Sequence, residues 1–301
     1  MANQWIKIGN ISGGGAYLGL PAKKDNLQIA RDVTPQYFIH SIHAKDAFIS
    51  KNKPGGNITM PLLAKDGVGE ILYAFFGQVQ TSGSGPYTHT FTAKEKDLPE
   101  LTIIKNVGTI QEKYTGVKVK SIKVKSPADG EMELTIDFVA KDGELTSGET
   151  EGPYDHSKTI LITGASVTWG GTAFQVGNVD LTLERDLDEG GFALNGDAGR
   201  SMIPEGNFKA EAEIDVLADD ITFAQDFATG ATKEFMLKLQ TKDGHTIEFH
   251  LPKAIVASRG KATDVDKGVL IEKVKLIGLD DGTHGSAYVV LTNDVASYPR
   301  T

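Results

Sequence analysis

The sequence predicts a mainly β protein with two tandem β-sandwich or barrel domains, each carrying one short flanking α-helix. Three observations support this prediction: many short segments alternate apolar and polar residues, each half has one stripe of helical period, and one apolar pattern occurs twice. A chain of 301 residues has room for two domains of ordinary size. We place the domains at residues 1–147 and 148–301, with the boundary in the polar, glycine-containing segment 144–158.

The repeated pattern runs from Gly116 to Val124 and again from Gly268 to Leu276. In the first copy the apolar residues lie at positions 117, 119, 122 and 124, and in the second at 269, 271, 274 and 276. Because a strand buries alternate residues, the change of phase inside each copy predicts a β-bulge at the same place. The copies are 152 residues apart (268 − 116), which predicts a duplicated domain.

The first half is expected to begin with an irregular arm rather than a core strand. Residues 1–30 are glycine-rich and alternate little, so Trp5 is expected to contact a neighbouring molecule. Strand-forming residues on both sides of the polar turn at 44–46 predict a long hairpin over residues 36–51. Ile58, Met60 and Leu62 then alternate with polar or small residues, as in a half-buried strand.

Each half contains one stripe of apolar residues at helical spacing. The first stripe follows Asp66, which can cap a helix, and precedes Gly77, which can end one. The second stripe precedes Gly230. The two predicted apolar faces consist of Val68, Ile71, Leu72, Phe75 and Phe76, and of Leu217, Ile221, Ala224 and Phe227.

The remaining alternating segments predict strands in matching order in the two halves. Four Asp-Gly pairs, at residues 129, 142, 243 and 281, supply the positive φ angles that tight turns need. The predicted strands are Tyr87–Thr92, Leu101–Lys105, Gly116–Lys125 and Glu133–Ala140 in the first half, and Glu234–Gln240, Thr246–Leu251, Gly268–Ile277 and Ser286–Thr292 in the second.

Composition argues against several classes of function. The net charge of −9 is unfavourable for binding a phosphate backbone, and it indicates either simple solubility or a surface that repels DNA. The absence of cysteine excludes disulfides and cysteine metal sites. No apolar run reaches the roughly 20 residues of a membrane helix, and the first residues lack the pattern of a signal peptide. We therefore expect a cytosolic product.

No residue cluster predicts catalysis, a cofactor site or a metal site. His40 and His43 would point to opposite faces of a strand, and residues 264–268 lack the ligand spacing of a calcium loop. The glycines at 13–19 lack the flanking strand and helix of a dinucleotide site, and residues 196–201 lack a P-loop lysine. The tryptophan at position 169 is expected in the core. We predict a protein that is not an enzyme.

Two ordered motif groups resemble the tail tube proteins of long-tailed bacteriophages. The first is Gly55–Leu62 followed by Ile71–Gly77, and the second is Pro86–Thr92 followed by Leu98–Ile103. The resemblance covers residues 36–142 and extends to the second half through the internal repeat. It identifies the predicted domains as tail-tube-like domains.

The resemblance implies a structural virion protein without cofactor. In that family, subunits join inner strands into a continuous barrel around a channel, and the rings stack into a tube. For a tandem chain it implies trimeric rings with pseudo-sixfold symmetry, through which DNA passes without specific binding and without a membrane partner. The implied partners are further copies of the chain and the tape measure, tail terminator and distal tail proteins. The implied location is the virion tail, after assembly in the host cytoplasm.

The hairpin at 36–51 and the acidic, glycine-rich segment 186–206 are the predicted assembly contacts. Two alternatives stay open at this stage: another tail component of the same fold, such as a distal tail or baseplate protein, and a carbohydrate-binding β-sandwich. An enzyme is the least favoured. The candidate contact residues are Tyr37, Phe38, His40, Ile42, Phe48, Asp186, Asp188, Glu189 and Phe192.

Overall fold

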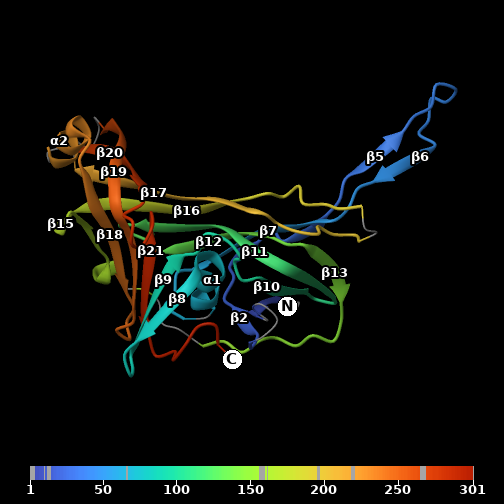
Figure 1. The fold of residues 1–301 in the computed structure, drawn as a ribbon, viewed down its shortest axis with the longest axis horizontal. Coiled ribbons are helices and arrows are strands. Elements are labelled where there is room, and N and C mark those ends of the chain that lie inside the picture. The colour runs from blue at the N-terminus through green and yellow to red at the C-terminus, as the bar shows by residue number, and fades with distance from the viewer. Residues whose placement is uncertain are drawn as a thin grey trace.

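The protein is mainly β, with strands covered by the helices α1 (Val68–Phe76) and α2 (Thr222–Thr229), as predicted (Figure 1). The computed structural model describes every residue except 1–3, 10, 12–14, 66, 156–159, 161, 195–196, 218–220, 265–268 and 301, and except the side chains of 162, 217, 261–264 and 269–270. The predicted cap Asp66 and most of the calcium-like segment 264–268 therefore lie outside the described residues. No described helix has the length and apolar character needed to cross a membrane.

The strands of the first half are β1 (Gln4–Gly9), β2 (Leu18–Leu20), β3 (Lys24–Asp25), β4 (Gln28–Ala30), β5 (Val33–Gln36), β6 (Asp46–Ile49), β7 (Lys53–Pro61), β8 (Gly77–Ser82), β9 (Tyr87–Ala93), β10 (Leu101–Val107), β11 (Ile110–Pro127), β12 (Glu133–Val139) and β13 (Asp142–Thr146). The second half follows with a 3-10 turn, η1 (Ile162–Gly164), and the strands β14 (Ser166–Trp169), β15 (Thr172–Phe174), β16 (Val176–Leu187), β17 (Glu205–Leu217), β18 (Thr232–Gln240), β19 (Thr246–Asp264), β20 (Val269–Gly278) and β21 (Tyr288–Asn293).

One sheet, which we call the long sheet, runs through both halves. Its strands pair antiparallel in the order β3/β4, β7, β12, β11, β16, β17, β20, β19. A first cover sheet has the order β2, β1, β10, β11, β13, and a second has β15, β14, β18, β19, β21, β9, β8. The strands β11 and β19 belong to a cover sheet with their first part and to the long sheet with their last. This arrangement buries one face of the long sheet in the core.

Helix α1 joins the two halves through the core. Its residues from Val68 to Phe76 are buried apart from Tyr73. The helix ends at Gly77, whose φ of 85° lies in the left-handed region that glycine adopts readily because it has no side chain. The rings of Phe75 and Phe76 contact Phe208 of β17, with centroids 5.5 and 5.8 Å apart. The predicted first helix, its apolar face and its end are therefore confirmed.

Helix α2 packs differently from the prediction. Ile221 and Phe227 are 62% and 47% exposed, and the helix buries Phe223 and Asp226 instead. The reason is Trp169, whose Nε1 donates a hydrogen bond of 2.7 Å to Asp226 Oδ2 and whose ring lies 5.5 Å from that of Phe223. Because this hydrogen bond holds the Asp226 carboxylate in the core, the buried face of the helix is rotated relative to the predicted face. The core position predicted for Trp169 is confirmed, at 2% exposure.

The bulge predicted in the first copy of the repeat exists, and the one predicted in the second copy is in a different strand. Lys120 is the extra residue of β11 opposite β12. In the second half the extra residue is Ala257 of β19, and the described residues of β20 pair without interruption. The apparent change of phase in β20 arises because buried Glu272 alternates with Val274 and forms an ion pair with Arg259.

Three further local predictions are wrong. Residues 4–9 form core strand β1, in which Lys7 is 5% exposed because its Nζ meets Glu149 Oε2 and Thr150 O, each at 2.8 Å. Trp5 is therefore buried in its own chain, at 5% exposure. The hairpin pairs Val33–Gln36 with Asp46–Ile49 around a loop at 37–45, so the predicted first strand is mostly loop. The Asp-Gly pair at 142 begins strand β13 rather than a turn.

The last residues of the chain bind the first half. The Asn293 side chain donates to Ala64 O at 2.7 Å, and Tyr298 lies so close to helix α1 that a Cβ on Gly69 would be 2.2 Å from its ring. Arg300 Nε lies 3.0 Å from Glu70 Oε1, and its Nη1 contacts Asp155. Burial raises the pKa of the Glu70 carboxyl to about 7, although Arg300 opposes the shift.

We predict that Glu70 makes stability decrease as pH rises from about 4.5 to 7. The folded chain keeps this proton to a higher pH than the unfolded chain, so the contribution is complete below the unfolded pKa and is lost through the folded pKa. A shift of this size corresponds to roughly 3 kcal/mol. Denaturant unfolding at several pH values should show a smaller decrease across this window for Glu70→Gln than for the natural chain. Equal slopes would contradict the assignment.

Candidate assembly interface

The exposed face of the long sheet is mostly polar, with the half-buried Ile255 and Ile277 as apolar residues near its β19 end. Its side chains alternate with the buried apolar ones, and the strand registers align them in rows across the sheet. One row contains Glu133, Lys125, Asp180, Glu213, Lys275 and Ser258, and the next contains Thr59, Thr135, Lys123, Thr182 and Glu211. Both rows cross from the first half into the second without interruption.

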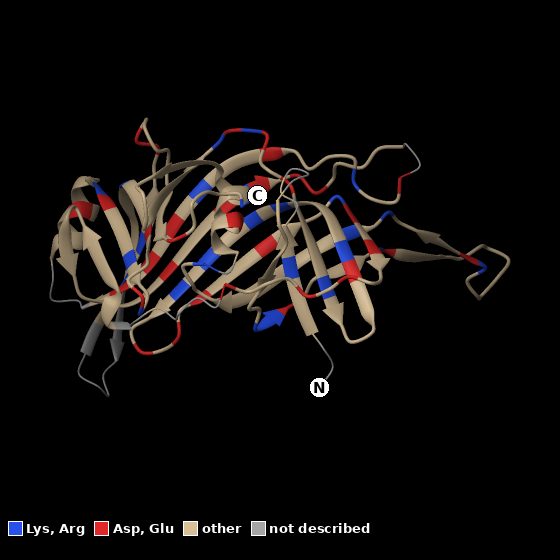
Figure 2. Cartoon of the chain, turned by 90° about the horizontal axis from the view of Figure 1, so that it is seen from below, with Lys and Arg blue, Asp and Glu red and all other residues tan. Residues whose placement is uncertain are grey.

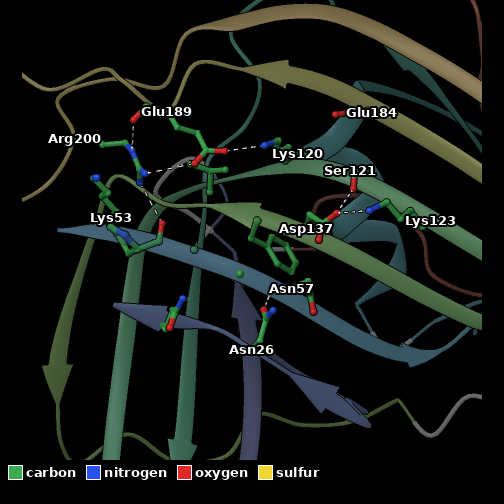
Figure 3. A pocket seen from close by; sticks show the side chains of 16 residues that line it. Asn26, Lys53, Asn57, Lys120, Ser121, Lys123, Asp137, Glu184, Glu189 and Arg200 are labelled. Carbon is green, nitrogen blue, oxygen red and sulfur yellow. Dashed lines mark hydrogen bonds and ion pairs between the residues drawn. The ribbon is translucent and has the colours of Figure 1, made fainter. Parts of the chain in front are cut away.

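A hollow of about 530 Å³ lies on this face where the two halves meet (Figure 3). Most of its charged groups are paired with one another. Lys123 Nζ lies 3.0 Å from Asp137 Oδ2, and Lys120 Nζ lies 2.8 Å from Glu189 Oε1. Arg200 Nε donates to Glu189 O at 2.8 Å. Among the residues that the structure describes, no group of three or more histidine, aspartate or glutamate side chains could hold a metal ion.

Among the described side chains of the polar face, acidic and basic residues are equally numerous. Figure 2 shows charges of both signs interspersed along the strands of the molecule. On the polar face the acidic residues are Glu133, Asp137, Asp180, Glu184, Asp186, Glu211, Glu213 and Asp215, and the basic ones are Lys24, Lys53, Lys120, Lys123, Lys125, Lys209, Lys273 and Lys275. Five of these lysines (Lys53, Lys120, Lys123, Lys209 and Lys275) form ion pairs with carboxylates, which leaves little positive charge to attract a polyanion.

The two halves meet in the long sheet at a junction between β11 and β16. Residues 121–127 pair antiparallel with residues 178–184, from Ser121 opposite Glu184 to Pro127 opposite Asn178. Each half therefore supplies one edge strand to the other. We call this contact the internal junction.

The segment between β16 and β17 strengthens the internal junction with side chains. Leu187 and Ile203 are buried in one small cluster with Val139 of β12. Lys118 of β11 lies 2.5 Å from Glu205 Oε1, and the two side chains are 10% and 6% exposed. Although burial opposes it, the hydrogen bonds from Lys118 and from Leu98 N hold the pKa of Glu205 below its usual value. Arg200 Nη1 donates to Ala140 O at 2.7 Å and Pro54 O at 3.2 Å.

The long sheet has an open edge at each end. Beyond Ile255, β19 pairs only with β20 in the described part of the chain. At the other end, β3 and β4 pair with β7, and no second strand among the described residues lies beside them. Open edges expose backbone N–H and C=O groups that favour pairing with another strand.

The two halves match strand by strand around these edges. The register irregularities of β11, at Tyr114/Val117 and Val119/Ser121, recur in β19 at Leu251/Ala254 and Val256/Ser258, which is an offset of 137 (254 − 117). The structural counterpart of β11 is therefore β19, not β20. Strands β3 and β4 pair with β7 as β16 pairs with β17. This relates residues 25, 28 and 30 of the first half to residues 179, 182 and 184 of the second, an offset of 154 (184 − 30).

The predicted contact residues fall into two different settings. The hairpin β5–β6 projects from the body of the molecule (Figure 1). Its side chains Tyr37, Phe38, Ile42 and Phe48 are 68%, 45%, 89% and 59% exposed, and His40 is also exposed. Their role in assembly stays a prediction.

The predicted contacts in the second half lie against the same chain. Asp186 pairs with Lys209 at 2.9 Å, Glu189 with Lys120, and Phe192 lies under Arg200 at 5.3 Å. Asp188 accepts a hydrogen bond from Gly190 N at 2.8 Å. Sequence reasoning missed Lys118 and Glu205, although a lysine within the apolar run at 117–119 is a signal for a buried ion pair.

A family model described as phage tail tube protein matches residues 43–272, which reach from the hairpin in the first half to strand β20 in the second. Comparison with curated protein sequences gives no match.

We predict that Lys118 and Glu205 matter as a pair. Removing one partner, in Lys118→Ile or Glu205→Ile, leaves a buried charge unpaired and should cost about 3–5 kcal/mol of unfolding free energy. The double variant should recover most of that loss, because an apolar pair of similar size avoids the unpaired charge. Chemical denaturation of the four proteins measures the coupling, and additive losses in the double variant would show that the residues act independently.

Proposed function

The chain belongs to the phage tail tube protein family, and we propose that it is the structural subunit that polymerises into the tube of a phage tail. The match covers most of both halves, and the family is one of structural proteins. The proposal adds what the match leaves open: how the chain joins its copies, how many chains close a ring, and what passes through it.

The observation that supports ring formation most strongly is the internal junction. The chain already contains one contact in which β11 of one half pairs with the first long-sheet strand of the next half. The open part of β19 and the open edge of β3 and β4 are the structural counterparts of those two strands. If one copy meets the next as its own halves meet, every open edge finds a partner and the sheet closes on itself.

We propose that three chains close such a ring. Under this proposal residues 1–147 and 148–301 are two tail-tube-like domains, and three chains contribute six similar units related by pseudo-sixfold symmetry. Residues 24–30 of one chain then pair with residues 258–264 of the next, with Gln28 opposite Gly260. The register follows from the internal junction, where Thr182 is opposite Lys123. The offset of 154 relates Thr182 to Gln28 (182 − 154), and the offset of 137 relates Lys123 to Gly260 (123 + 137).

The polar face of the long sheet then becomes the wall of a channel. The net charge of −9 on each chain disfavours a DNA phosphate backbone within about one Debye length, roughly 8 Å at physiological ionic strength. DNA can therefore pass without being held. The rings would stack into the tube of a virion tail, and the ends of that tube would meet the tape measure, tail terminator and distal tail proteins.

A disulfide experiment tests the proposed register. The natural chain contains no cysteine, so every cross-link comes from introduced residues. The variant with Gln28→Cys and Gly260→Cys should form bonds between chains on mild oxidation, giving a ladder on a non-reducing gel that ends at the trimer. Directly opposed residues of antiparallel strands lie within the Cα distance that a disulfide spans.

Two matched variants serve as controls. Lys123→Cys with Thr182→Cys occupies the same register within the internal junction and should cross-link inside one chain. Lys24→Cys with Gly260→Cys is four residues out of register and should stay mostly unlinked. Cross-linking of the shifted pair as efficient as that of the matched pair would contradict the register. A chain that stays monomeric at every concentration in microscopy and sedimentation would contradict the tube proposal.

A further inference from the structure

Two apolar side chains stand exposed at the base of the projecting hairpin. Val33 of β5 and Ile49 of β6 lie directly opposite each other and are 55% and 53% exposed. The offset of 154 relates Val33 to Leu187. Strands β7 and β17 differ by 156 (Lys53 to Lys209), which relates Ile49 to Glu205, and Leu187 and Glu205 also lie directly opposite each other. The base of the hairpin is thus the counterpart of the segment that strengthens the internal junction.

The receiving side of that contact also has a counterpart. In the internal junction Leu187 packs on Val139 and Glu205 binds Lys118, and Lys118 and Val139 are themselves register partners. The matching register pair in the second half is Ile255 and Ile277. Both isoleucines are half-buried and lie beside the open part of β19.

We propose that Val33 and Ile49 of one chain pack against Ile277 and Ile255 of the next, as an apolar lock between neighbouring subunits. The occupant of this patch is a second copy of the same chain, so the inference rests on the proposed ring. It adds that the buried ion pair found inside the chain is replaced by two isoleucines between chains. Ile49 takes the place of Glu205, and Ile255 takes the place of Lys118.

The exchange of a polar pair for an apolar one fits the difference between the two contacts. Lys118 and Glu205 belong to one chain and need no association step. Two separate chains lose translational and rotational freedom on binding, and burial of apolar area is the general source of free energy for offsetting that loss. Apolar residues also leave no unpaired charge on a subunit that has not yet assembled.

Restoring the polar pair between chains tests this inference. Ile49→Glu alone, or Ile255→Lys alone, should raise the concentration at which half of the chains are assembled by at least tenfold, because each buries a charge without a partner. The double variant should return most of that loss. Light scattering and sedimentation measure assembly, and thermal unfolding of the monomers verifies that the substitutions leave the fold intact.

The control is Ile42→Glu combined with Ile255→Lys. Ile42 lies in the hairpin loop, outside the proposed lock, so this combination should not restore assembly. Single variants that assemble like the natural chain would overturn the lock while leaving the tube proposal standing. Restoration by the control combination would indicate general charge attraction and would equally overturn the lock. A natural chain that fails to assemble contradicts the tube proposal itself.

Discussion

The backbone hydrogen bonding of the long sheet is the constraint on which the rest of the structure depends. A sheet that crosses both halves must end somewhere, and each end leaves a row of unpaired N–H and C=O groups. Inside the chain this problem is solved once, where β11 pairs with β16. In the proposed ring, the open edge of β19 in one chain and that of β3 and β4 in the next form the same kind of contact. Self-association follows from this arrangement more directly than from any single side chain.

The two halves share this plan and differ where the chain must hold itself together. The first half inserts β8 and β9 after α1, and β9 pairs with β21 of the second half, whereas α2 is followed directly by β18. The C-terminal residues return to α1 through Tyr298 and Arg300. Together with the internal junction, these contacts bind the halves into one unit with a defined spacing between its two edges. A head-to-tail contact between such rigid subunits closes into a ring when its rotation fits a whole number of subunits, as the proposed ring requires.

Sequence reasoning predicted the fold class, helix α1 and most strands, because their apolar periodicity is local. Three of its errors share one cause, a buried polar group whose partner lies on another segment of the chain. Lys7 is buried against Glu149, so its polar side chain obscured the apolar pattern of β1. Glu272 is buried in an ion pair with Arg259, so β20 was predicted to contain a bulge that it lacks. Asp226 is buried against Trp169, so α2 buries a different face from the predicted one. For the interface, the hairpin was evident from its composition. The open edges were not, because which strand lacks a neighbour is a property of non-local pairing.

Electron cryomicroscopy of the assembled protein tests the central claim most directly. The account predicts rings of three chains in which residues 24–30 of each subunit continue the sheet of the next subunit at residues 258–264, with the polar face of the long sheet lining the channel. A ring closed through other elements, or one whose channel is lined by a different face, would contradict it.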